Sequence, residues 1–112
     1  MKLDDLVQVS AAVAATSGRL EKTSLLAALL TRLAPDEIPI AIGFLTGWPH
    51  QGRLGVGWTT VASARDHAPA AEPSLELRDV DHAIGQLISV RGKNSASERA
   101  RLIGDLFARA TA

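Results

Sequence analysis

Apolar residues recur every three or four positions through most of this 112-residue chain, which is the spacing of one face of an α-helix. This spacing predicts a first helix over residues 3–16 and a second, leucine-rich helix over residues 19–33. A third helix is predicted from Pro35 to Gly47, because proline fits a first helical turn and glycine suits a helix end. No stretch alternates with a period of two for long enough to require a strand.

The second part of the chain continues the helical pattern with shorter elements. We expect a short helical segment from Trp58 to Arg65, followed by a connection over residues 66–74 whose prolines and small residues favour irregular structure. This connection is expected to join two helical groups. A further helix is predicted over residues 79–91, with Gly92 as the C′ residue just beyond its end.

The last helix has the clearest start signal in the sequence. Ser95 and Glu98 have the spacing of a capping box, in which each side chain accepts a hydrogen bond from a backbone N–H group of the other's residue. An apolar stripe through Leu102, Ile103 and Leu106 follows at helical spacing. The predicted fold is therefore all-α, a single domain over residues 1–112 built as a small bundle of about five helices.

The composition narrows the classes of function. The chain has no cysteine, which excludes disulfides, thiolate metal sites and thiol catalysis. Its twelve basic residues balance twelve acidic residues, so a polyanion site has to come from local segregation of charge. No apolar run is long enough for a membrane span, and the acidic start of the chain does not resemble a targeting peptide. These features predict a cytoplasmic protein that makes no membrane contact.

Two further patterns in the sequence give little indication of a nucleotide-binding or catalytic site. The glycines at positions 52, 55 and 57 match neither dinucleotide nor P-loop spacing, and they suit a tight turn. Each close pair of carboxylates lies at a predicted helix start, where the helix dipole favours negative charge. These pairs are Asp4 with Asp5, Asp36 with Glu37, and Asp79 with Asp81. No convergent set of titratable side chains indicates a small-molecule enzyme.

Residues 91–101 differ from the glycine and carboxylate patterns because they do suggest a binding site. We name this segment the basic corner. It combines a helix end, a glycine turn, two serines, a new helix start and four basic side chains, at positions 91, 93, 99 and 101. Such a set suits a site that binds a phosphate without reading a base. The same composition also suits a solvated turn with surface arginines, so both interpretations remain open at this stage.

Five short motifs in order resemble the N-terminal DNA-binding domain of ATP-dependent DNA ligases, most closely those of the actinobacterial type. They are TSGRLEKT at residues 16–23, FLTG at 44–47, RLGVGW at 53–58, GKNS at 92–95, and the stretch that runs on to Leu106 and Phe107. The resemblance extends over essentially all 112 residues. It implies an all-helical domain that lies on duplex DNA across the minor groove and holds a nicked substrate.

The resemblance also assigns residues to phosphate binding. By analogy, the main contacts with DNA phosphates are expected from Lys93, Ser95, Ser97 and Arg99, with Arg19 and Arg53 as additional candidates. The family often has glycine at the position of Asn94.

The resemblance further implies that this chain corresponds to the first half of a two-part helical domain. Family members continue with a second helical half, a nucleotidyltransferase domain and an OB-fold domain, and they use ATP and magnesium. The three lysines of this chain lack the K-x-D-G motif of the family's catalytic lysine, so the chain by itself is expected to hold no cofactor and to form no enzyme–AMP intermediate. Its expected partners are nicked duplex DNA and the remaining domains of the same ligase.

An alternative from another class is a helical module for protein interaction or dimerisation that does not bind DNA. In this interpretation Trp48, Leu54 and Trp58 are exposed and dock a partner or a second copy of the chain.

Overall fold

The computed structural model describes residues 1–49, 51–52, 58–65 and 68–111, with residues 58–60 described by their backbone only. Among these residues the chain forms six helices and no strand, which confirms the predicted all-α class. The predicted number was about five helices, and the short helix α4 is the additional one. The helices are α1 (Leu3–Ala15), α2 (Arg19–Thr31), α3 (Ile38–Thr46), α4 (Trp58–Ala64), α5 (Leu77–Ser89) and α6 (Ser95–Ala108).

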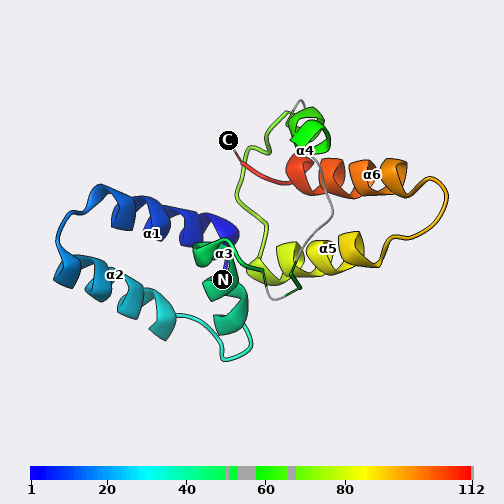
Figure 1. The fold of residues 1–112 in the computed structure, drawn as a ribbon. Coiled ribbons are helices and arrows are strands. Elements are labelled where there is room, and N and C mark those ends of the chain that lie inside the picture. The colour runs from blue at the N-terminus through cyan, green and yellow to red at the C-terminus, as the bar shows by residue number, and fades with distance from the viewer. Residues whose placement is uncertain (50, 53–57, 66–67, 112) are drawn as a thin grey trace.

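The helices form two lobes arranged side by side (Figure 1). In the first lobe, α1 packs along α2 and α3 closes one end of the pair; in the second lobe, α6 packs against both α4 and α5. The radius of gyration is 15.3 Å, against about 13 Å for a compact chain of this length. Residues 66–74 connect two helices of the second lobe, so the division between the helical groups falls between α3 and α4.

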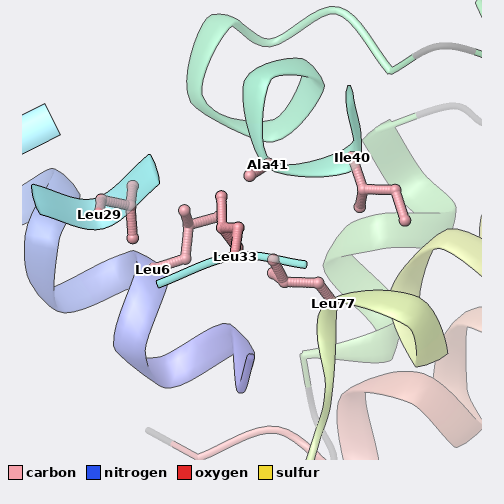
Figure 2. Close-up of a cluster of buried hydrophobic side chains, with 6 residues drawn as sticks. All are labelled: Leu6, Leu29, Leu33, Ile40, Ala41 and Leu77. Carbon is pink, nitrogen blue, oxygen red and sulfur yellow. The ribbon is translucent and has the colours of Figure 1, made fainter. Parts of the chain in front are cut away.

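The first lobe has the larger hydrophobic core. Figure 2 shows its side chains converging from α1, from α2 and the residues just after it, from α3, and from the start of α5. They are Leu6, Leu29, Leu33, Ile40, Ala41 and Leu77. Leu77 is 0% exposed although it belongs to a helix of the second lobe. The start of α5 therefore completes the core of the first lobe.

The second lobe has a smaller core. Ala64 of α4, Leu87 of α5 and Ile103 of α6 form its buried cluster, and Leu102 and Phe107 pack against it. Because α4 and α5 both lie on α6, this last helix is the element that holds the lobe together.

The lobes meet at the N-terminal end of the chain. The backbone of Leu3 donates to Leu75 at 2.7 Å, and that of Leu77 donates to Met1 at 2.9 Å. The Met1 ammonium group lies 2.5 Å from a carboxylate oxygen of Glu37 and 3.0 Å from one of Glu76. The hydrogen bond from this ammonium group lowers the pKa of the buried Glu37 carboxyl, and the N–H of Ala34 lowers it further. Charges as well as apolar contacts join the lobes.

Several predicted boundaries shift for identifiable reasons. Residues 35–37 form a turn, closed by the N–H of Glu37 on the carbonyl of Ala34 at 2.9 Å, and α3 begins at Ile38 with Glu37 as its N-cap residue. Gly47 does end α3, in the left-handed conformation that glycine favours, with φ of 77°.

The fifth helix also begins and ends earlier than predicted. It begins at Leu77, two residues before the predicted start, since Asp79 accepts a hydrogen bond from the N–H of Glu76 at 2.9 Å and so caps the first turn. It ends at Ser89 with an extended Val90, which places Gly92 beyond the C′ position that we predicted for it. None of the helices described in the structure has both the length and the apolar character needed to cross a membrane.

Candidate nucleic-acid interface

The basic corner lies at the tip of the second lobe, where the chain passes from α5 to α6 at the right of Figure 1. The two helices pack on each other, with Leu87 and Ile103 in their shared cluster. This packing fixes where one helix ends and the other begins. The corner therefore projects from a supported pair of helices.

Two residues with positive φ shape the turn. Gly92 has φ of 86° and Asn94 has φ of 65°. Asparagine tolerates this left-handed conformation better than most residues, which explains how Asn94 can occupy this position of the turn. The N–H of Ser95 then donates to the carbonyl of Gly92 at 3.3 Å and closes the turn.

The predicted capping box at Ser95 is wrong. Asn94 is the N-cap residue of α6 and Ser95 is the first helical residue, so the helix starts one position earlier than the box requires. No side chain caps this end of the helix. The Glu98 carboxylate pairs instead with Arg101, and this hydrogen bond lowers the pKa of Glu98.

Two arginines of the corner bind the end of α5. An Nη1–H of Arg91 donates to the carbonyl of Ile88 at 2.7 Å, and an Nη2–H of Arg99 donates to the carbonyl of Val90 at 3.2 Å. The last carbonyls of a helix lack partners within the helix, and basic side chains satisfy them well. Arg99 is therefore a residue that holds the corner in shape as well as a source of positive charge. Arg91, which our predicted site omitted, shares this role.

The remaining predicted residues of the corner are available to a ligand. Lys93 is exposed and has no carboxylate partner among the residues that the structure describes. Ser97 is exposed and Ser95 half-buried, and within the same described residues neither hydroxyl makes a hydrogen bond. Arg101 is already engaged by Glu98 and by Asp105, at 3.1 Å from the latter. Lys93 and the two serines thus lie together at the uncapped start of α6.

The other candidates are not gathered at this corner. Arg19 is exposed at the start of α2, which lies at the opposite end of the molecule in Figure 1. Arg53 and the glycines at positions 55 and 57 lie outside the described residues. The structure therefore brings together four of the six predicted contacts.

Most other arginines are compensated by carboxylates, which limits where an anion can bind. Arg78 lies 2.8 Å from Asp36, and Arg109 lies 3.2 Å from Asp79. Arg32 is also close to a carboxylate, that of Asp5 at 3.9 Å. These pairs join segments that are distant in sequence, so no local pattern in the sequence indicates them.

The chain is similar over nearly its whole length to bacterial proteins named probable DNA ligase. It is 49% identical to the protein of Pseudarthrobacter chlorophenolicus over 99% of this chain and 22% of that protein. It is 47% identical to that of Saccharopolyspora erythraea over 98% of this chain and 21% of that protein, and 46% identical to that of Anaeromyxobacter dehalogenans over 100% and 22%. No protein-family model and no solved structure matches the chain. The chain thus spans about a fifth of these relatives, and the predicted resemblance to DNA ligases is confirmed.

Proposed function

We propose that this chain is a segment of an ATP-dependent DNA ligase and that it positions the DNA substrate through contacts between the basic corner and backbone phosphates. The similarity to proteins named probable DNA ligase supports the first half of this proposal. The observation that carries the second half is Lys93, which is exposed, has no carboxylate partner in the described part of the chain and lies beside the uncapped start of α6.

The chemistry of the corner suits a phosphate. The first turn of a helix leaves backbone N–H groups without partners, and the helix dipole adds partial positive charge there. Lys93 supplies a full charge, and the hydroxyls of Ser95 and Ser97 supply neutral donors. All of these groups recognise a phosphate and none is placed to read a base edge, so the proposed binding is independent of sequence.

The proposed role is to hold duplex DNA near a nick while other domains seal it during replication or repair in the cytoplasm. The basic corner lies at one end of the molecule, and the start of α2, where Arg19 is the first residue, lies at the other end (Figure 1). ATP and magnesium belong, in this proposal, to the other domains of the ligase.

The decisive experiment is a salt titration of binding to nicked duplex DNA. Replacing Lys93 by alanine should reduce the slope of log affinity against log salt by about one unit, because each phosphate contact contributes about 0.9. The Lys93→Ala, Arg99→Ala double variant should reduce it by about two units if both side chains contact phosphates. The matched control is Arg78→Ala, which removes a positive charge that Asp36 already compensates.

Melting of each variant is followed in parallel, because Arg99 also binds the end of α5. Equal slopes for the folded wild type and the Lys93→Ala variant would refute phosphate binding at the corner.

A second candidate function is a helical module that binds protein and not DNA. It is favoured by the exposure of Trp48, which is 79%, while the side chains of Leu54 and Trp58 lie outside the described part. Absence of any salt-dependent binding by the wild type would favour this candidate.

A further inference from the structure

The α-amino group of Met1 lies where the two lobes meet, at the label N in Figure 1. It contacts one carboxylate from each lobe. Glu37, the N-cap residue of α3, lies at 2.5 Å, and Glu76, the N-cap residue of α5, lies at 3.0 Å. A single ammonium group therefore links the starts of two helices that belong to different lobes.

The backbone holds this ammonium group in place. The carbonyl of Met1 accepts a hydrogen bond from the N–H of Leu77 at 2.9 Å, and the N–H of Leu3 donates to the carbonyl of Leu75 at 2.7 Å. The Met1 side chain is 3% exposed and packs against the core of the first lobe. Because the main chain fixes the nitrogen between the two carboxylates, the ion pairs require little further loss of conformational entropy.

The Glu37 carboxylate depends on this ammonium group for its compensation. Glu37 is buried, and one of its oxygens accepts a hydrogen bond from the N–H of Ala34 while the other accepts from the ammonium group. Arg78 also attracts this carboxylate, but its guanidinium group is more than half exposed and lies 2.8 Å from Asp36. A buried carboxylate that loses its counterion is costly, so the folded state needs the positive charge on the Met1 nitrogen.

An acyl cap on the Met1 nitrogen removes that charge. A formyl group converts the ammonium group into a neutral amide, which has one N–H in place of three. One N–H does not serve the carboxylates of Glu37 and Glu76 together, and without a charge it attracts each of them less. The cap therefore weakens the contact with both lobes.

We propose that the α-amino group of Met1 is a modification-sensitive link between the two lobes. The free ammonium group joins the starts of α3 and α5, and an acyl cap on the same nitrogen, such as the formyl group that bacteria place on an initiating methionine, releases them. Removal of a formyl group consumes one water molecule, breaks the bond between the formyl carbon and the nitrogen, and yields formate and the free amine, which takes up a proton. This link is independent of the proposed DNA contacts.

The test compares formylated and free chains in three backgrounds. The 112-residue chain is produced in bacteria with and without an inhibitor of peptide deformylase, and its intact mass identifies each product. Chemical denaturation at neutral pH gives the equilibrium constant for folding. We expect formylation to lower this constant roughly tenfold or more in the wild type, because a hydrogen bond to a charged group contributes that much.

The Glu37→Gln variant shows whether the effect acts through the buried charge. In this variant formylation should lower the folding constant only about threefold or less, since the remaining partner, Glu76, is half-exposed. The matched control Glu72→Gln, at an exposed position, should show the full wild-type effect. Equal losses in the wild type and in Glu37→Gln would overturn the proposal, because the cap would then act by its bulk. No loss in the wild type would also overturn it.

Hydrogen exchange tests whether the cap opens the joint between the lobes. Exchange of the Leu77 N–H, which donates to Met1, should accelerate by a larger factor than exchange of the Ile103 N–H in the core of the second lobe. Equal acceleration of the two amides would contradict a link between the lobes.

A formylated chain that does not fold is tested by removing the cap. Purified peptide deformylase is added, and loss of the formyl group is followed by mass. Recovery of the helical circular dichroism would support the proposal, and a deformylated chain that stays unfolded would count against it.

Discussion

The two lobes differ in how they are stabilised. The first lobe buries six core residues and holds the Glu37 carboxylate, 5% exposed, beside the N-terminal ammonium group. The second lobe has a buried cluster of three residues, and its ion pairs, such as that of Arg101 with Asp105, lie at the surface. The second lobe therefore depends on the first lobe for its stability, because its own hydrophobic core is small and exposed ion pairs contribute little to the free energy of unfolding.

The lobes also differ in the surfaces that they present. The first lobe carries an uncharged groove, whereas the second carries the uncapped helix start with Lys93. The apolar hollow lined by Val13, Leu26 and Leu30 and the basic corner therefore lie on different lobes.

The strongest test of this dependence is the substitution Leu77→Ala. Leu77 is fully buried in the core of the first lobe while belonging to α5 of the second, so its truncation should destabilise both lobes by about 2–5 kcal/mol. Calorimetry should show one transition at a lower temperature. The control Leu20→Ala, at an 85% exposed position, should stay within about 0.5 kcal/mol. Two separate transitions, only one of them shifted, would mean that the lobes unfold independently.

A smaller but clear effect is expected from Glu37→Gln. The variant keeps an acceptor for the N–H of Ala34 but removes the charge that faces the Met1 ammonium group, which should lower the free energy of unfolding by roughly 1.5–3 kcal/mol. Chemical denaturation at neutral pH measures this decrease in the free energy of unfolding. Glu72→Gln, at an exposed position without an ion pair in the described structure, is the matched control and should have no effect.

The same pair predicts how stability depends on pH. Because folding lowers the pKa of Glu37, its contribution is complete above the ordinary glutamate pKa and is lost as pH falls through the lowered value. The hydrogen bond to Glu37 raises the pKa of the Met1 ammonium group, whose contribution is complete below its ordinary pKa and is lost as pH rises through the raised value. Chemical denaturation measured across the pH range should show that the free energy of unfolding of the wild type falls at both acidic and alkaline pH. Both decreases should be much smaller in the Glu37→Gln variant.

The smallest effect is expected from Arg101→Gln in the second lobe. Arg101 and both of its carboxylate partners are substantially exposed, so solvent and salt screen their attraction. The melting temperature at physiological salt should not change measurably, and the lowered pKa of Glu98 should return toward its ordinary value in a titration followed by NMR. A marked loss of stability would show that surface charges hold the second lobe together.

Local patterns in the sequence were sufficient to predict which stretches of the chain form helices. The leucine-rich stretch predicts α2 within two residues and the start of α6 was predicted within one, because a buried face imposes a period of 3.6 wherever it packs. The basic corner was also recognisable, since it depends on a glycine turn and adjacent basic residues. Boundaries shifted where local capping differed from the prediction, as at Asp79 for α5 and at Asn94 for α6. The contact between Glu37 and Met1 spans 36 positions, so no local pattern indicates it.

The sequence by itself determined the all-α class, the position of the basic corner and the relationship to DNA ligases. Only the tertiary structure decided that Leu77 belongs to the core of the other lobe and that Arg99 binds the carbonyl of Val90. It alone gave Arg78 and Arg109 carboxylate partners while leaving Lys93 without one among the described residues. The physical reason is range: helix periodicity and turn conformation arise between near neighbours, whereas burial and charge pairing depend on which distant segments the folded chain brings together.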